Sequence, residues 1–410
     1  YSNSTQLATF IIGSYIYNLY LHPLRKFPGP WTHRASRIPW AYHSLRGDLN
    51  EHLLQLQRRY GVEGHARRRS CPPTTCSSPA ASTLLISLST PTRPGVVVSA
   101  ATDNYLTFDV LGQLAFSSDF QCLERSELHP WISSMFSDSL FGPVCLSVLV
   151  NFGFQVAVDL LYKQLGARFR RLRQSARLKV YDRLDNEKPQ DDFTEVLLRK
   201  LAKDTGTEAI LMTGPTLIFA GSETQATLLY GLTYLLTRNL TALQKLTEEV
   251  RGAFATQEGI TYTDVSRLRY LAACINEGLR YFPSVANAST KRSPAGGCVI
   301  NGDFVPGGTI SGIYHYAMYH NAVYFKNPDE FHPERWLGDP EYANDRRELF
   351  QPFAIGPLAH AEIRMVLATM VLNFDLELWE DNPSLLKEMR AYGVFWSKPD
   401  LNLRLKPVNG

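Results

Sequence analysis

One long stretch of helical periodicity constrains the fold of this chain more than any other feature. From 208 to 239, apolar residues recur at three- and four-residue spacing, which predicts a single long helix. Its middle, residues 220–224, has the sequence Ala-Gly-Ser-Glu-Thr. Glycine and hydroxyl side chains weaken a helix, and such a break is typical of a widened turn that faces a ligand. Glu223 could relay a proton there and Thr224 could hold one, whereas a polar spot facing solvent is the alternative.

Shorter segments with the same spacing, and a few strand patterns, fill most of the remaining chain. Further helices are predicted over 34–60, from 105 onward, and over 194–204, 240–254, 264–281 and 359–373. Strands are predicted over 298–304, 309–313 and 374–379, with glycine-rich turns between the first two. The predicted fold class is therefore mainly α with a minor β-sheet.

Two charged motifs lie downstream of the long helix. Glu277 and Arg280 occupy positions i and i+3, which share one face of a predicted helix. Arg335 follows in the proline-containing sequence FHPERW. Brought together in a core, these three charges would form a buried, hydrogen-bonded structural lock. Taken alone, the helix pair is more often a surface ion pair of little energetic value.

The N-terminal residues suggest a membrane. Residues 1–20 are expected to be the end of a truncated N-terminal anchor, because 7–20 is apolar and aromatic but shorter than the roughly 20 residues of a bilayer span. Basic residues follow this stretch: Arg25, Lys26, Arg34 and Arg37. They favour the cytoplasmic side of a membrane. A buried amphipathic helix is the alternative.

Residues 64–102 differ from their flanks. This segment has no acidic residue and is dominated by serine, threonine and proline, so loop or disorder is expected. It is interpreted as an aberrant low-complexity insert, such as a retained intron or a shifted frame. The spacing of Cys71 and Cys76 resembles half a zinc site, but no second half follows. Apart from this insert, 21–410 is predicted to form one domain.

The motifs taken together resemble the cytochrome P-450 family of heme-thiolate monooxygenases. The Ala-Gly-Ser-Glu-Thr helix, the Glu-x-x-Arg helix and Pro-Glu-Arg-Trp occur in the family's order, and the N-terminal LHPLRKFPGP hinge resembles its membrane-bound eukaryotic members. The sequence as a whole is similar to the family's fungal members that act in secondary metabolism. This resemblance implies an incomplete P-450 fold, heme as the cofactor, NADPH-cytochrome P-450 reductase as the partner, and a small apolar substrate.

The same resemblance assigns roles to individual residues. Gly221 would lie over the heme, with Glu223 and Thr224 delivering protons to iron-bound oxygen. Arg292 falls where the family often places a partner of a heme propionate. The structural lock behind the heme would consist of Glu277, Arg280 and Arg335. The family's Trp-x-x-x-Arg helix, which should precede Tyr105, is missing from the sequence.

The heme ligand itself is missing as well. The family signature is Phe-x-x-Gly-x-Arg-x-Cys-x-Gly, and residues 353–357 begin it with Phe-Ala-Ile-Gly-Pro. The chain then passes straight to Leu358, in a segment that resembles the helix after the cysteine. The axial cysteine is therefore absent between Pro357 and Leu358, as if by a short in-frame deletion, and no metal ligand is assigned. His360 is the nearest substitute, but ligation by it would require rearrangement.

Thiolate ligation drives cleavage of the oxygen–oxygen bond in this family, so its loss predicts a protein without monooxygenase activity. Its ancestral role would be the oxidation or hydroxylation of a small apolar metabolite. One alternative is an active heme-thiolate monooxygenase whose true sequence contains the missing residues. Another is a membrane-tethered scaffold that binds a pathway partner. The net charge of +3 and the lack of a basic stripe argue against nucleic acid.

Overall fold

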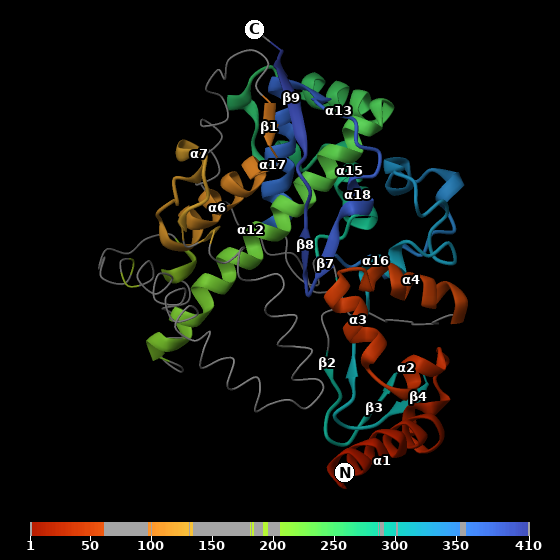
Figure 1. Ribbon diagram of the computed structural model, residues 1–410. Helices are drawn as coiled ribbons and strands as arrows, with labels where there is room; N and C mark the ends of the chain where they lie inside the picture. Colours follow the sequence, from red (N-terminus) through yellow and green to blue (C-terminus); the bar gives the residue numbers. More distant parts are fainter. Residues whose placement is uncertain are drawn as a thin grey trace.

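The computed structural model describes residues 2–60, 97–99, 101–130, 132–133, 181, 183, 192–195, 206–285, 287, 291–300, 302–352 and 358–408. The prediction of a mainly α fold with minor β structure is confirmed (Figure 1). The α-helices are α1 (Ser2–Ile16), α2 (Trp31–Ala35), α3 (Ile38–Arg46), α4 (Leu49–Tyr60), α6 (Ala101–Phe116), α7 (Cys122–Arg125), α12 (Gly206–Arg238), α13 (Leu240–Ala253), α14 (Tyr262–Val265), α15 (Arg269–Tyr281), α16 (His315–Tyr319), α17 (Leu358–Asn373) and α18 (Leu385–Glu388).

The strands are short and antiparallel. They are β1 (Val97–Ser99), β2 (Lys291–Arg292), β3 (Cys298–Ile300), β4 (Asp303–Val305), β5 (Ile310–Ser311), β6 (Phe374–Leu378), β7 (Arg390–Tyr392), β8 (Phe395–Ser397) and β9 (Asn402–Pro407). β9 lies between β1 and β6, while β2–β5, β3–β4 and β7–β8 form two-stranded pairs. The strand predicted over 298–304 is thus a hairpin, which turns at Gly302 with φ +84°.

The helix predicted over 208–239 is α12, which has 33 residues and crosses the molecule diagonally (Figure 1). At 1.5 Å per residue it is about 50 Å long. α6 packs along its N-terminal half, where Phe108 lies 6.5 Å from Phe219, centroid to centroid. Leu228, Leu232 and other apolar residues further along α12 enter the main core. α12 therefore connects the contact with α6 to the main core.

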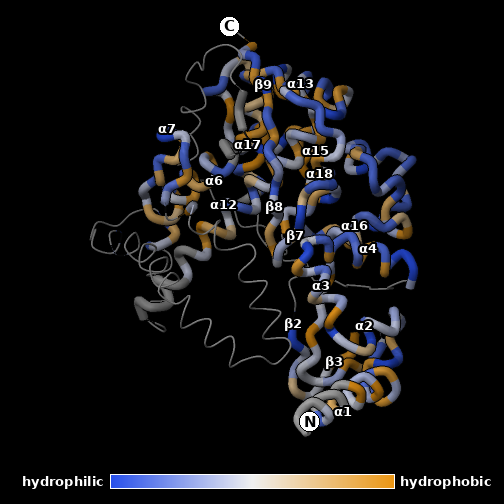
Figure 2. Tube along the Cα trace, viewed as in Figure 1, coloured by the Kyte–Doolittle hydropathy of each residue, from blue (hydrophilic) through white to orange (hydrophobic). Residues whose placement is uncertain are grey.

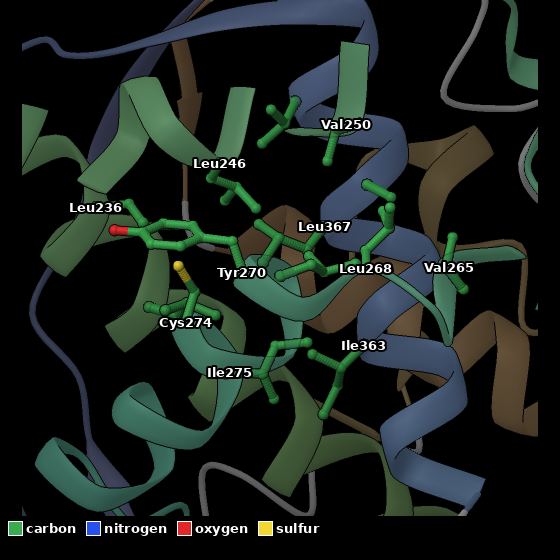
Figure 3. Close-up of a cluster of buried hydrophobic side chains, with 14 of the residues drawn as sticks. Leu236, Leu246, Val250, Val265, Leu268, Tyr270, Cys274, Ile275, Ile363 and Leu367 are labelled. Atoms are coloured by element: carbon green, nitrogen blue, oxygen red, sulfur yellow. The ribbon is translucent and has the colours of Figure 1, made fainter. Parts of the chain in front are cut away.

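The main core lies where α12, α13, α15 and α17 meet (Figure 3). Leu246 of α13, Ile275 of α15 and Leu367 of α17 are each at most 1% exposed. Figure 2 shows hydrophobic stretches gathered around α15 and α17. Burial of apolar side chains at this junction supplies the main driving force for the fold. It also fixes the position of α17, the helix that begins next to the interrupted signature.

The segment predicted as loop or disorder over 64–102 is partly ordered. Val97–Ser99 forms β1, and Val98 pairs with Leu403 of β9. β-branched residues suit an extended strand, and an available edge of β9 satisfies their backbone groups. That partner lies at the other end of the chain, which is why local composition did not predict it. Residues 61–96 lie outside the described residues.

The N-terminal elements form one end of the molecule (Figure 1). α1 continues into a single π-helical turn, Tyr17–Leu21, and then a 3₁₀ turn, Pro23–Lys26. Lys26 is ion-paired with Asp303 of β4, which ties this end to the β3–β4 hairpin. Among the residues that the structure describes, no helix is both long enough and apolar enough to cross a membrane.

Candidate functional site

The structure brings Glu277, Arg280 and Arg335 together, and all three side chains are fully buried. Arg280 forms a two-pronged pair with the Glu277 carboxylate, with Nη2–Oε1 and Nε–Oε2 distances of 2.9 and 3.0 Å. Arg335 Nε lies 3.0 Å from Glu277 Oε2. Burial alone would raise the pKa of Glu277, but the two arginines outweigh it and the pKa is lowered. This carboxylate is therefore ionised within the core.

Two partners in this cluster were not predicted from the sequence. Asp345 is ion-paired with Arg335, and its side chain is 1% exposed. The indole Nε1 of Trp336 donates to Glu277 Oε2 at 2.9 Å. Two arginines facing one glutamate leave an uncompensated buried charge, so charge balance alone indicated a second acid. It did not indicate which one, because Asp345 comes close only through the fold.

The segment 220–224 is an uninterrupted part of α12, so the predicted widened turn is wrong. The hydroxyls that were expected to disrupt the helix have found acceptors within the fold. Thr224 Oγ1 donates to the carbonyl of Ala220 at 2.8 Å, and Ser222 Oγ donates to the carbonyl of Thr107 on α6 at 3.1 Å. Because these bonds leave the backbone hydrogen bonds of α12 intact, the helix does not widen.

Glu223 and Thr224 point to different surroundings. The carboxylate of Glu223 is 2% exposed and lies 2.9 Å from Lys398 Nζ, with Thr227 Oγ1 donating to it at 3.2 Å. Thr224 instead lines a cavity. These two candidate residues are adjacent in the sequence, but their side chains lie on different faces of α12.

Gly221 lies in the contact between α6 and α12. A Cβ at this position would come within 3.0 Å of Leu111 Cδ1 on α6. The absence of a side chain therefore permits close packing of the two helices. Arg292 lies on β2, where its side chain is exposed, and it does not line the cavity next to Thr224. The structure does not bring Arg292 together with the α12 candidates.

The cavity lies between α12, α15 and α17 and encloses about 190 Å³. Its lining comprises Thr224, Gln225, Leu279, Ser284, Val285, Pro352 and Ile363. Cavities that hold ligands of drug size usually span about 300–1,000 Å³. The space between the described residues is therefore smaller than a typical ligand site.

The first turns of α17 carry buried polar groups beside this cavity. Glu362 is 8% exposed and accepts a hydrogen bond from Gln225 Nε2 of α12. Burial raises the pKa of Glu362 to about 7, although the Gln225 bond opposes that shift. Burial also lowers the pKa of His360 to about 4 and lowers the pKa of Arg364. The residues 353–357, which begin the signature, lie outside the described residues.

The described cysteines lie elsewhere. Cys274 points into the main core beside Tyr270 (Figure 3), and burial raises its pKa well above the ordinary value. Burial raises the pKa of Cys122 to about 11. Cys298 is half-buried in β3, with Sγ 3.6 Å from Ser293 Oγ. Cys71, Cys76 and Cys145 lie outside the described residues. Within the described ranges, no three His, Cys, Asp or Glu side chains are placed to hold a metal ion.

The chain belongs to the cytochrome P450 family. The family model described as "Cytochrome P450" matches residues 91–404. Two fungal relatives are averantin hydroxylase from Dothistroma septosporum, 31% identical over 98% of this chain and 92% of the relative, and trichothecene C-15 hydroxylase from Fusarium sporotrichioides, 32% identical over 99% and 97%. The crystal structure of cytochrome P450DA heme domain has a TM-score of 0.62 at 20% identity, covering 80% of this chain and 71% of that one. This likeness shows the P450 fold.

The alignment lengths reveal that this chain is internally shorter than its relatives. The comparison with averantin hydroxylase extends over 486 aligned positions, whereas this chain has 410 residues. Since 98% of the chain takes part, the relative carries residues at dozens of internal positions where this chain has none. Cytochrome P450 proteins typically use heme, a redox partner and small substrates. This chain shares their fold but lacks many of their internal positions.

Proposed function

We propose that this protein keeps the cytochrome P450 scaffold but lacks heme-thiolate monooxygenase activity. Its ancestor would have oxidised or hydroxylated a small apolar metabolite of fungal secondary metabolism with NADPH-cytochrome P-450 reductase. One observation carries the proposal: Pro357 is followed directly by Leu358, so the sequence has no cysteine where the signature requires the iron ligand. Without a thiolate, electron density cannot be directed into iron to favour oxygen–oxygen cleavage.

The buried thiols of Cys122 and Cys274 do not suit a thiolate-ligated heme. A thiolate ligand must be deprotonated, whereas burial favours the neutral thiols of Cys122 and Cys274. His360 is neutral at pH 7 but lies inside α17, next to Arg364 on the following turn. No catalytic step through heme is therefore derived for this sequence. The roles expected of Gly221, Glu223, Thr224 and Arg292 at a heme are proposed to be vestigial.

The decisive experiment is spectroscopic. The purified full chain is reconstituted with heme, reduced and exposed to carbon monoxide, and we expect no Soret band of the thiolate-ligated type. A matched variant with Arg-Ala-Cys-Ile-Gly inserted between Pro357 and Leu358 supplies the signature that the family requires and serves as the comparison. A thiolate-type band in the uninserted chain would overturn the proposal, and Cys274→Ser would then show whether that core thiol is the ligand.

A second candidate function is an active heme-thiolate monooxygenase of secondary metabolism. The observation that favours it is the length of the alignments, because relatives that match nearly all of this chain contain many additional internal residues. A message that encodes those residues would restore the cysteine and the helix expected before Tyr105. Sequencing the mature transcript between the codons for Pro357 and Leu358 decides: an Arg-x-Cys-x-Gly segment there supports this candidate, and an uninterrupted join excludes it.

Membrane attachment through residues 1–20, on the cytoplasmic face of the endoplasmic reticulum, is proposed as well, with 21–410 as the P450 domain. Apolar and aromatic side chains at this end are strongly exposed, including Phe10 at 74%, Tyr20 at 64% and Trp31 at 68%. Residues 1–47 contain basic but no acidic side chains, which suits anionic lipid. Flotation with vesicles containing phosphatidylserine tests this: the full chain is expected to float, and a chain lacking residues 1–20 to stay behind.

A further inference from the structure

Three histidines from three helices are stacked at the N-terminal end of the body. The rings of His43 and His52 are 3.7 Å apart, centroid to centroid, and inclined by 10°. His33 contacts His52 as well, with its Nε2 3.0 Å from His52 Nε2 and the two rings inclined by 19°. At that distance one imidazole N–H donates to the lone pair of the other ring, so at least one of the two nitrogens must be unprotonated.

The stack joins α3 and α4, which are tied to the body of the molecule, to α2 and the segment that precedes it. The α3–α4 turn is tied to β7 by a hydrogen bond from Ala391 N to Gly47 O, 2.8 Å, and α4 is tied to α16 by Arg58 Nη2 to His320 O, 2.9 Å. α2 carries His33 and is only five residues long. It connects backward to the π-helical turn, where Asn18 Nδ2 donates to Ala35 O at 2.8 Å. The histidine contact therefore holds α2 and the preceding segment against α3 and α4.

Few opposite charges are available to compensate additional protons in the stack. Asp48 is the acid that faces it, with Oδ1 2.7 Å from His43 Nδ1, and the same carboxylate is shared with Arg46 Nε at 3.1 Å. Tyr42 of α3 meets His43 edge-on at 5.2 Å, and Thr32 Oγ1 of α2 lies 3.4 Å from His33 Nδ1. Two further charged residues of α4, Glu51 and Arg58, act on Tyr316 of α16. Adding a second and a third proton to the stack would thus place positively charged rings against one another. The Asp48 carboxylate, which already pairs with Arg46, could compensate them only in part.

We propose that the His33–His43–His52 stack is a pH-sensitive latch, which holds α2 and the N-terminal segment on α3 and α4 at neutral pH and releases them on acidification. Geometry sets the direction, because full protonation removes the N–H···N bond and introduces repulsion across the 3.7 Å stack. Burial, and then the charge of His43, lowers the pKa values of His33 and of His52, the latter to about 4. Neutral imidazoles therefore favour the closed form, and closure weakens as the pH falls below about 6.5.

Hydrogen exchange of the full-length chain tests the latch. After correction for the intrinsic pH dependence of exchange, peptides covering α2 are expected to lose roughly tenfold in protection between pH 7.5 and pH 5, equivalent to one pKa unit of linkage. Peptides from α15 report whether the body stays folded. The variant His52→Gln, neutral at every pH, is expected to keep α2 protected at pH 5, whereas His52→Arg carries a permanent charge and is expected to expose α2 already at pH 7.5.

A matched control separates the stack from histidine titration in general. His332 pairs with Glu330 at the surface, Nε2–Oε2 2.7 Å, in a segment remote in sequence from α2, so His332→Gln is expected to retain the full acid response. Equal protection of α2 at pH 7.5 and pH 5 in the unmodified chain would overturn the proposal. Retention of the whole acid response in His52→Gln would do the same, because the stack could not then be its origin.

Discussion

Two buried polar groups of the same molecule differ in how completely their charges are compensated. Around Glu277, both carboxylate oxygens are engaged by Arg280, Arg335 and Trp336, and Asp345 balances the second arginine. At the start of α17, Glu362 has one oxygen bonded to Gln225, and its Oε1 has no hydrogen-bond partner among the described residues. Both sites are buried and polar, but only around Glu277 do both carboxylate oxygens have partners among the described residues.

The difference separates polar groups whose partners the chain itself supplies from polar groups that adjoin the interrupted signature. The Glu277 cluster connects α15 to the loops that follow it, entirely through chain atoms, so loss of the iron ligand leaves it unaffected. The polar groups of α17 adjoin the interrupted signature, and Arg364 Nε likewise has no partner among the described residues. Unsatisfied buried polar groups destabilise a fold. We infer that the α12–α17 junction is the weaker of the two regions.

The largest effect is expected when the well-compensated cluster is broken. Glu277→Gln removes the carboxylate charge and leaves two buried guanidinium groups facing one aspartate. The unfolding free energy, measured by urea denaturation, is expected to fall by about 3–5 kcal/mol, as for other buried pairs that lose one partner. Glu341→Gln is the control, since Glu341 and Lys326 are each about half exposed at 3.1 Å. It is expected to change stability by less than about 1 kcal/mol. Similar effects of the two variants would contradict the comparison.

The next effect concerns pH and the weaker region. Burial raises the pKa of Glu362 from 4.5 to about 7, so between these values the unfolded chain loses a proton that the folded chain keeps. Stability is therefore expected to decrease as the pH rises from 4.5 to 7, by roughly 3 kcal/mol for this group, and to level off above pH 7. Glu362→Gln should remove this contribution while still accepting the bond from Gln225.

The measurement for Glu362 is the difference in unfolding free energy between the unmodified chain and Glu362→Gln at several pH values. Glu348→Gln provides a control, because Glu348 lies on the surface with its side chain 55% exposed. The Glu362→Gln difference should change with pH and the Glu348→Gln difference should stay nearly constant. A pH-independent difference for Glu362→Gln would show that this carboxyl is not held neutral in the folded chain.

Much of the scaffold could be predicted from the sequence because its signals are local. The periodicity over 208–239 gave α12 within a few residues, and the i, i+3 spacing placed Glu277 and Arg280 on one helix face. What could not be predicted depends on contacts distant in sequence. Local composition predicts loop or disorder where β1 forms, because its partner, β9, lies near the C-terminus.

The candidate site shows the same limit. The widened turn predicted at 220–224 was wrong because Ser222 found an acceptor on α6, a helix whose proximity no local pattern reveals. Lys398 was not singled out, although it forms the ion pair with Glu223. A single lysine in a C-terminal loop has no distinguishing spacing. Charge balance for a buried carboxylate indicates that some cation is needed, but only the fold selects it.

The ion pair of Glu223 and Lys398 tests how completely the buried charge in the middle of α12 is compensated, compared with the Glu277 cluster and the α12–α17 junction. Glu223 Oε1 is paired, but its Oε2 has no partner among the described residues. Lys398→Met is expected to lower the unfolding free energy by about 2 kcal/mol, because the buried carboxylate loses its cation. The double variant Lys398→Met/Glu223→Gln should recover most of that loss. A double-mutant cycle in urea measures the coupling; additive effects would mean that the pair contributes nothing.

The smallest expected effect compares a glycine beside the Glu277 cluster with a glycine in the α6–α12 contact. Gly278 of α15 and Gly221 of α12 each have a leucine Cδ1 3.0 Å from the place where a Cβ would lie. Alanine gains up to about 1 kcal/mol of helix propensity at either site. At Gly278 the methyl group also meets Leu228 at 3.4 Å, and both neighbouring leucines are fully buried, so overpacking by about 1–3 kcal/mol should outweigh that gain. At half-buried Gly221 only Leu111 must move, so Gly221→Ala is expected to lie within about 1 kcal/mol of the unmodified chain. Thermal unfolding of the two variants side by side measures this difference, and a larger loss for Gly221→Ala would place the rigid packing in the α6–α12 contact instead.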